Sequence, residues 1–208
     1  MNRWMGYAGR LSSIAGALCL CVAGGAYLDG AIASQLAIGM FTNAARTGDA
    51  APDQTLWSER AKAAYVEALA HDLEPVGVLR VPRLAIEVPV FMGTAPLTLN
   101  RGVGVIQGTA SPGTIGNIGI SGHRDSYLRA LKDIEVGDLI ELASKDGAHA
   151  YRVTNLSIVD PLDVSPIEPS PTAMLTIVTC HPFYYVGPAP DRFIVRALPV
   201  EPAVASGQ

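Results

Sequence analysis

The chain contains few cysteines and histidines, and this scarcity excludes several classes of site. Its 208 residues include three Cys and four His, and no Cys or His pair has the spacing of a zinc site. Charge is sparse and balanced, with 15 Lys and Arg against 19 Asp and Glu and a formal net charge of −4. Nucleic-acid binding needs a basic stripe, and none is present. We therefore expect no metal, no cofactor and no nucleic-acid partner.

One long uncharged run lies near the N-terminus. Residues Leu11 to Leu28 carry no charged side chain, and this length is close to the ~20 residues that cross a bilayer. Arg3 and Arg10 precede the run and Asp29 ends it. Because Lys and Arg near a span favour the cytoplasmic side, we expect a cytoplasmic N-terminus over 1–10 and a single-pass anchor over 11–28 in the inner membrane. Everything after Asp29 would then lie outside the cytoplasm.

Two alternatives to an anchor remain open. Ala31-Ile32-Ala33 offers a small-x-small cleavage site, as in a signal peptide. A lipoprotein is disfavoured, because a lipobox requires a small residue before its cysteine, whereas Cys19 and Cys21 are each preceded by Leu. In every version the rest of the chain is exported, and Cys180 is its only thiol in an oxidising compartment. Cys180 is then an intermolecular partner, a buried bystander or a reactive thiol.

The segment after the anchor changes character twice. Residues 29–75 are predicted to form a linker and one amphipathic helix, Trp57 to Leu73, in which apolar residues recur at three- and four-residue spacing. From Val76 on, short β-type runs alternate with Gly, Pro, Asn and Asp, which is typical of an antiparallel barrel. We predict a mainly β domain over 76–200 and a C-terminal tail over 201–208. No internal repeat is visible.

The predicted domain is a small closed barrel with eight strands and one short helix, Ser126 to Lys132. The strands are expected at Val76–Val81, Ala85–Phe91, Gly102–Ile106, Asn117–Gly122, Gly137–Ala143, Ala148–Val159, Met174–Cys180 and Arg192–Leu198.

The last two predicted strands carry a candidate catalytic pair. Cys180 ends one strand and Arg192 begins the next, so in a hairpin the thiol and the guanidinium would be neighbours. A guanidinium favours a nearby thiolate and supplies a fork of donors where an oxyanion develops. Arg196 is a competitor for this role. At ~3.4 Å per residue it would lie some ~13 Å further along the strand, so we select Arg192.

His123 directly follows the predicted strand Asn117–Gly122 and could act as base and acid. Taken alone, a single His near a turn or a single buried Cys is more often structural. Together, one exported thiol, one histidine at a strand end and one arginine at a strand start can fill the nucleophile, base and oxyanion roles.

The chain resembles the sortases, most closely the class D type and its Gram-negative branch. Four stretches carry the resemblance. They are Gly104 to Gly113 followed by Gly116-Asn117, the histidine motif Ser121 to Arg124, the strand Leu175 to Cys180, and the arginine strand Gly187 to Val195. The departures are small: Ile177-Val178 stands where Leu-x is usual, and Val105 occupies a position often held by a second histidine.

The resemblance implies an eight-stranded barrel and a thioester mechanism on an exported protein with a Leu-Pro-x-Thr-Gly type sorting signal. Cys180 would attack after the threonine, His123 would protonate the leaving amine, and Arg192 would hold the signal and the oxyanion. An amine acceptor in the envelope would resolve the thioester. Asn117, Ser121 and Thr179 lie in the matching stretches and are predicted to contact the substrate.

The remaining candidates have weaker interpretations. His181 would point away from the thiol and line a loop, and His71 and His149 are expected to be exposed. Asp160, Asp163 and Glu168 lie in a Pro-rich loop where some sortases bind calcium, but their spacing does not require an ion, and we expect a wall of the substrate groove.

Two other functions are alternatives. An L,D-transpeptidase places His and Gly just before its Cys and Arg two residues after, whereas Thr179 precedes Cys180 and Arg192 follows it by twelve. A non-catalytic, membrane-tethered β module for binding or assembly would contain an inert Cys180.

Overall fold

The structure, a computed structural model, describes residues 52–184 and 187–200. The predicted cytoplasmic segment 1–10, the anchor 11–28, the tail 201–208 and most of the linker lie outside these residues. Across the described ranges, no helix combines the length and the apolar character that crossing a membrane requires. The described residues belong to one unit by their contacts.

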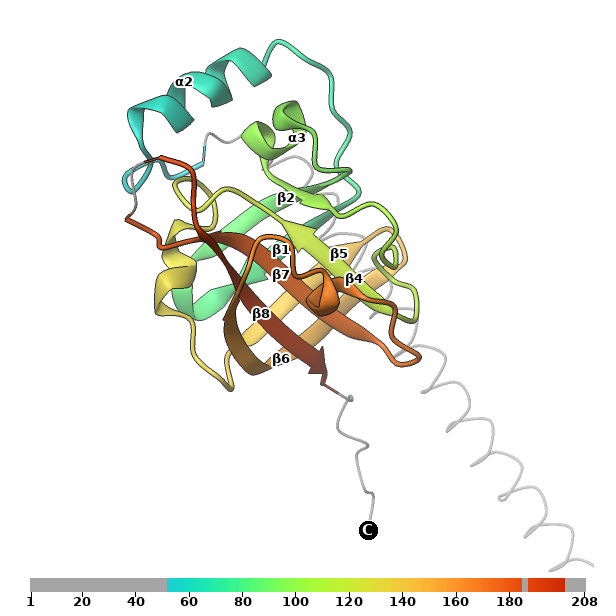
Figure 1. Ribbon diagram of the computed structural model, residues 1–208. Coiled ribbons are helices and arrows are strands. Elements are labelled where there is room, and N and C mark those ends of the chain that lie inside the picture. Colours follow the sequence, from blue (N-terminus) through green and yellow to red (C-terminus); the bar gives the residue numbers. More distant parts are fainter. Residues whose placement is uncertain (1–51, 185–186, 201–208) are drawn as a thin grey trace, which may run out of the picture. The chain divides into compact units, whose positions relative to one another are not determined.

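Eight strands close into a barrel, as the sequence predicts (Figure 1). The barrel order is β1-β2-β3-β4-β7-β8-β6-β5, and β5 pairs back onto β1. Most neighbours are antiparallel, but β2–β3 and β4–β7 are parallel. The strands are β1 (Gly77–Val81), β2 (Ile86–Met92), β3 (Val103–Val105), β4 (Asn117–Ser121), β5 (Leu139–Ser144), β6 (Gly147–Val159), β7 (Met174–His181) and β8 (Asp191–Pro199).

The barrel interior is filled by aliphatic side chains. Alternate strand residues point inward, so the period of two in the sequence becomes a continuous apolar core. Because strand length and alternation are local properties, the sequence locates all eight strands to within a few residues. The largest fully buried side chains are Leu79, Ile118, Ile120, Leu128, Leu131, Ile140, Leu142, Leu175 and Ile177.

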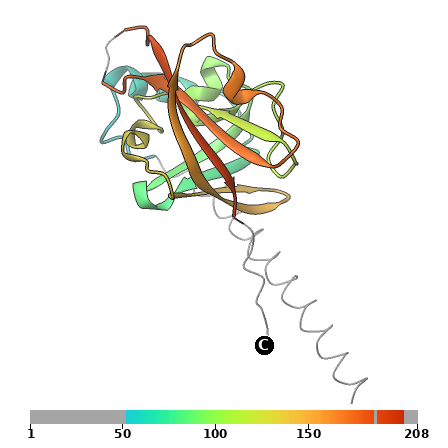
Figure 2. The same cartoon turned by 60° about the horizontal axis from the view of Figure 1, so that its bottom comes forward.

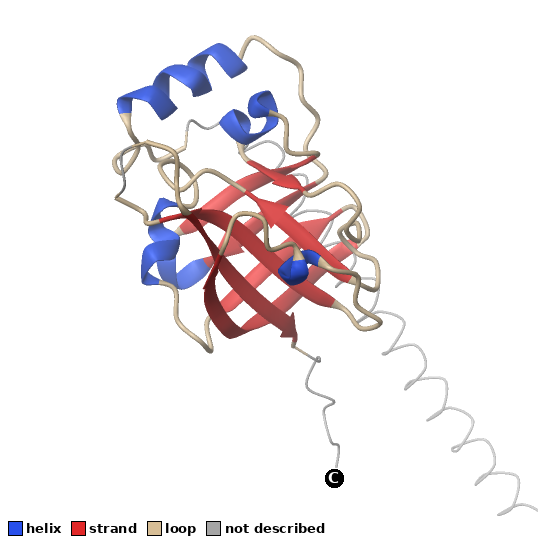
Figure 3. Ribbon diagram, in the orientation of Figure 1, coloured by secondary structure: helices blue, strands red, loops and turns tan. Residues whose placement is uncertain are grey.

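Short helices lie outside the barrel (Figure 3). The helix expected over Trp57–Leu73 is shorter, because α2 covers only Glu59–Ala68. The helix expected over Ser126–Lys132 is a 3-10 helix, η2 (Arg129–Asp133). The α-helix α3 (Pro96–Arg101) was not predicted, since six residues give no periodic signal. Two further 3-10 turns are η1 (Pro82–Leu84) and η3 (Ser165–Ile167).

Aromatic packing fixes α2 onto the segment that follows β4. The Trp57 ring lies 4.5 Å from the Tyr127 ring and 5.6 Å from the Tyr65 ring, both edge to face. Burial, and secondarily the neighbouring Tyr65, raises the pKa of the Tyr127 phenol. At the other end of α2, Arg101 Nη1 donates to the carbonyls of Ala68 and His71, which satisfies groups left open at a helix terminus. The helix is thus attached at both ends.

Candidate active site

Three adjacent strands bring the predicted catalytic residues to one end of the barrel. In the β7–β8 hairpin Cys180 pairs directly with Arg192, as expected from the sequence. In the parallel β4–β7 pair, Ser121 lies opposite Val178. His123 is two residues past Ser121 and Cys180 is two residues past Val178, so both are at the same ends of their strands. Figure 2 shows β7 and β8 crossing the barrel side by side.

β7 and β8 also present Cys180 and Arg192 on one face. Leu175 and Ile177 belong to the core, so the alternate residue Cys180 points out of the barrel. Its free thiol is half-buried. On β8, Val195 and Ala197 belong to the core, and Arg192 therefore shares the outer face with Cys180.

A glycine and a buried hydroxyl position the histidine segment. A Cβ on Gly122 would lie 2.7 Å from Leu128 Cδ1 and 2.8 Å from Val103 Cγ1, so only glycine allows this close packing. The Thr179 hydroxyl donates to the Gly122 carbonyl at 2.8 Å, and Gly122 N donates to the Val178 carbonyl at 3.2 Å. The residue before His123 is therefore tied to the residue before Cys180.

The His123 imidazole is half-buried, and its surroundings act on it in opposite directions. Burial lowers the pKa of His123 below its ordinary value of 6.5. The Asp125 carboxylate raises this pKa and the Arg60 guanidinium lowers it, with burial the largest cause. Because the net direction is down, the neutral imidazole predominates at neutral pH, and a neutral imidazole can accept a proton.

Arg192 is held by backbone on one side only. Its Nη1 donates to the Asp191 carbonyl at 3.0 Å and to the Ala189 carbonyl at 3.4 Å. Its Nε and Nη2 have no hydrogen-bond acceptor among residues 52–184 and 187–200, so both can donate to a ligand. The competitor Arg196 pairs with Thr176, four residues further along the hairpin, as expected.

His181 lies among aromatic rings away from the thiol. Its ring is stacked on Phe193 at 6.2 Å and meets Phe183 edge to face at 6.1 Å. Since Phe183 belongs to the core and Phe193 packs against it, His181 faces the opposite side of β7 from Cys180.

Two of the three predicted substrate-binding residues have structural hydrogen bonds. Asn117 is 4% exposed, and its Nδ2 donates to the carbonyls of Pro166 and Glu168. Its Oδ1 accepts from the Thr176 hydroxyl at 2.8 Å. Thr179 is 2% exposed and bonded to Gly122. Ser121 is half-buried, and contact of Asn117, Ser121 and Thr179 with the substrate stays a prediction.

The β6–β7 loop is braced by its own backbone and by Asn117. Asp160 Oδ1 accepts from Leu162 N at 2.8 Å, and Asp163 Oδ1 accepts from Ser165 N at 2.9 Å. The bonds to Ser165 lower the pKa of Asp163. In the part of the chain that the structure describes, no group of three or more His, Cys, Asp or Glu side chains could hold a metal ion.

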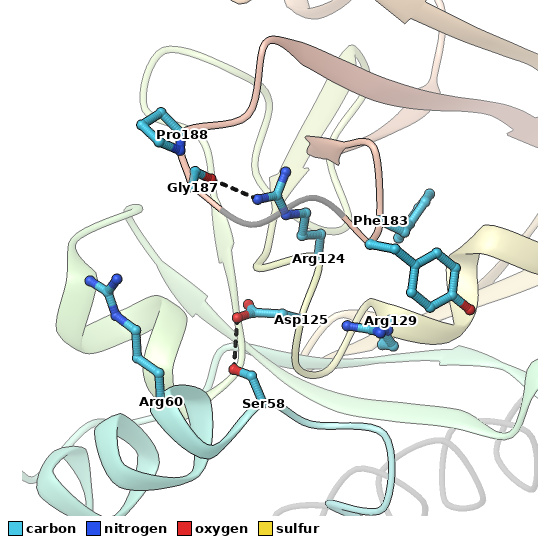
Figure 4. A pocket seen from close by; sticks show the side chains of 9 residues that line it. Ser58, Arg60, Arg124, Asp125, Arg129, Phe183, Gly187 and Pro188 are labelled. Atoms are coloured by element: carbon cyan, nitrogen blue, oxygen red, sulfur yellow. Dashed lines mark hydrogen bonds between the residues drawn. The ribbon is translucent and has the colours of Figure 1, made fainter.

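A cavity beside His123 was not predicted from the sequence. Its volume is about 640 Å³, and it lies between the start of α2, the segment after His123 and the β7–β8 loop (Figure 4). Three arginines line it: Arg60, Arg124 and Arg129. They come from separate parts of the sequence, so no local pattern joins them. The one local signal is that Arg124 directly follows His123.

Comparison with known proteins agrees with this geometry. The family model described as the sortase domain matches residues 79–200, which is more than half of the chain. Sortase D of Bacillus subtilis (strain 168) is 37% identical over 120 residues, which cover 57% of this chain and 61% of that protein. The chain thus spans less than two thirds of the length of this relative.

Solved structures show the same fold. Sortase A from Corynebacterium diphtheriae, in a lid-mutant form, has a TM-score of 0.58 at 25% identity, and the match covers 66% of this chain and 76% of that chain. A sortase D5 transpeptidase of Clostridium perfringens has a TM-score of 0.57 at 20% identity, covering 80% and 99% of the two chains. From the family match, the barrel order and the shared end of β4, β7 and β8, we conclude that this chain belongs to the sortase family.

Proposed function

We propose that the protein is a cysteine transpeptidase that cleaves a Leu-Pro-x-Thr-Gly type sorting signal after its threonine and transfers the product to an amine in the cell envelope. One observation carries the proposal: Cys180, His123 and Arg192 lie at the same end of three adjacent strands, with Cys180 paired to Arg192. Nucleophile, proton carrier and oxyanion donor are the three roles that acyl transfer requires.

In the first half-reaction, Cys180 Sγ attacks the threonine carbonyl carbon. Arg192 Nε and Nη2 donate to the oxygen, where negative charge develops. Neutral His123 takes the thiol proton as Cys180 attacks and gives it to the leaving amine as the C–N bond breaks, so that a thioester to Cys180 remains.

In the second half-reaction, an amine attacks the thioester. Neutral His123 takes a proton from the amine, a new C–N bond forms, and the C–S bond breaks. The released Cys180 thiolate then takes this proton back from His123, which restores both groups. The lowered pKa of His123 supports this step, because it keeps the imidazole unprotonated at neutral pH. Water would resolve the same thioester more slowly.

The location of the enzyme is part of the proposal. An anchor over 11–28 with a cytoplasmic N-terminus would hold the catalytic domain on the outer side of the inner membrane, where exported clients and envelope amines meet. Reporter fusions after Asp29 should be active only with a periplasmic reporter. A soluble mature protein that begins after Ala33 would instead establish a cleaved signal.

Trapping of the thioester tests the activity. The full-length protein, incubated with a fluorogenic sorting peptide, should show an acyl adduct on Cys180 by mass spectrometry. Cys180→Ala should lose both the adduct and peptide cleavage while its circular dichroism and melting temperature stay close to wild type, since the thiol is only half-buried.

Peptide cleavage by Cys180→Ala near the wild-type rate would refute the mechanism. Failure of the wild-type thiol to react with iodoacetamide, together with the absence of an adduct, would favour a non-catalytic β module.

A further inference from the structure

The cavity beside His123 carries more positive than negative charge. Arg60, Arg124 and Arg129 line it, together with one carboxylate, Asp125. That carboxylate already accepts from the Ser58 hydroxyl at 2.8 Å. Figure 4 shows the three arginines around Asp125 in this view. The cavity therefore has a surplus of guanidinium groups.

Two of these arginines have no carboxylate partner. Within residues 52–184 and 187–200, neither Arg60 nor Arg129 forms an ion pair. The Arg129 guanidinium lies 4.6 Å from the Tyr184 ring centre. Stacking on a ring fixes the plane of a guanidinium and leaves its N–H edges able to donate. Such a fork matches the geometry of a carboxylate.

The location links the cavity to the chemistry of His123. Arg124 and Asp125 directly follow His123, so the segment that carries the proposed base forms one wall. Arg60, in the first turn of α2, forms the opposite wall of the same cavity. A ligand in the cavity would thus approach from the side of His123, where the incoming amine must lose its proton.

We propose that this cavity binds the amine acceptor through a carboxylate on the acceptor, with Arg60 and Arg129 as the anion-binding groups. This inference rests on the proposed function. The bound acceptor would present its amine to His123 and the thioester; the amine proton passes to His123, the C–N bond forms and the C–S bond to Cys180 breaks. The acceptor class is therefore an amino-terminal peptide or amino acid that also carries a free carboxylate.

Acceptor discrimination tests the inference. The full-length enzyme, saturated with one sorting peptide, is given triglycine or triglycine amide, which have the same amine and differ by one negative charge. We expect kcat/KM for the acceptor to favour triglycine about 10-fold at low salt, the size of one charge-assisted contact near a surface. In the double variant that combines Arg60→Gln and Arg129→Gln, the ratio of kcat/KM for triglycine to kcat/KM for triglycine amide should fall to about one. Triglycine amide should remain an acceptor.

Within each variant, both acceptors react with the same thioester, formed from the same sorting peptide. A change in the rate of thioester formation therefore affects both kcat/KM values equally and leaves their ratio unchanged. Arg152→Gln is the matched control for the single variants Arg60→Gln and Arg129→Gln, because Arg152 is exposed on β6, outside the cavity, and each of these substitutions removes one positive charge. The control should keep the 10-fold preference. Equal use of the two acceptors by the wild-type enzyme, or an equal loss of preference in Arg152→Gln, would overturn the proposal.

Two further outcomes are distinguishable. If the arginines instead bind an acidic group of the sorting signal, the double variant would lower thioester formation and leave the acceptor ratio unchanged, which overturns the acceptor site. If no acyl adduct forms on Cys180 in the absence of acceptor, the proposed function itself has failed.

Discussion

The β1–β2–β5 side of the barrel and the β4–β7–β8 side use their charged groups differently. On the first side, Arg80 Nη2 lies 3.0 Å from Glu87 Oε1. Arg83 donates to the buried Asp138 carboxylate through Nε and Nη2. On the second side, His123 and Arg192 take part in no ion pair with any residue in 52–184 or 187–200. One side pairs its charges internally, and the other leaves donors open at a strand end.

The difference separates groups that stabilise the fold from groups that await a ligand. A paired, hydrogen-bonded charge contributes to stability, whereas an open donor near a thiol contributes nothing to folding until something binds it. Substitutions of the open groups His123 and Arg192 should therefore affect catalysis with little effect on stability. Substitutions on the β1–β2–β5 side should do the reverse.

The largest effect is expected at Arg192. If its open nitrogens meet the oxyanion, Arg192→Ala should lose ~2.7 to 4 kcal/mol of transition-state stabilisation, a fall of about 10² or more in kcat/KM. Arg192→Lys should rescue only part, because an ammonium keeps the charge but not the planar fork. Steady-state kinetics on one fluorogenic sorting peptide measure both.

Arg196→Ala is the matched control on the same strand. Arg196 pairs with Thr176 rather than Cys180, so its loss should cost far less in catalysis and act through stability. Equal losses at the two positions, or a larger loss at Arg196, would assign the oxyanion role to the other arginine.

The pairing of Cys180 with Arg192 could be predicted from the sequence. It follows from strand alternation and one hairpin, both of which are local properties, and the observed register confirms it. The eight strands were found for the same reason. Helix limits were less well predicted: Ser58 caps α2 by accepting from Ala61 N, and the helix ends ten residues later, before the apolar pattern does.

Long-range features could not be predicted. Nothing local indicates that Asn117 would bond to Pro166 and Glu168 or that Thr179 would bond to Gly122. The arginine cavity depends on α2 packing beside the segment after His123. That packing is set by contacts between Trp57 and Tyr127, which are far apart in the chain.

A smaller effect, on stability alone, is expected at Asp138. This carboxylate is 9% exposed and accepts from Arg83 Nε, Arg83 Nη2 and Glu135 N. Asp138→Asn removes the charge that these donors hold and should lower the melting temperature by a few degrees at pH 7, with kcat/KM at 25 °C close to wild type. Thermal melts and peptide cleavage on the same preparations check this.

The pH dependence sharpens the Asp138 prediction. Hydrogen bonds from Arg83 hold the pKa of Asp138 below its ordinary value of 3.8. The pKa of Asp138 is therefore lower in the folded protein than in the unfolded chain, where it is about 3.8. As the pH falls, Asp138 takes up its proton in the unfolded chain before it does so in the folded protein. The stabilisation is thus fully present above about pH 3.8 and is lost as the pH falls through the pKa of the folded protein. The difference in melting temperature between Asp138→Asn and wild type should narrow in that window. A difference that stays constant into acid would show that the charge is not the cause.

The smallest expected effect concerns the protonation of His123, whose pKa responds to the Asp125 carboxylate and the Arg60 guanidinium. Burial and Arg60 lower the pKa of His123 while Asp125 raises it. Asp125→Asn should therefore move this pKa further down, and Arg60→Gln should move it up toward 6.5.

NMR titration of the imidazole protons measures the direction of both shifts, and the His123 signal is assigned by its loss in His123→Gln. The control Arg152→Gln should leave the titration of His123 unchanged. Because burial is the largest cause, neither variant should restore the ordinary value fully. Shifts of the same sign in Asp125→Asn and Arg60→Gln would mean that the two substitutions act by moving α2 or the histidine segment, and not through their charges.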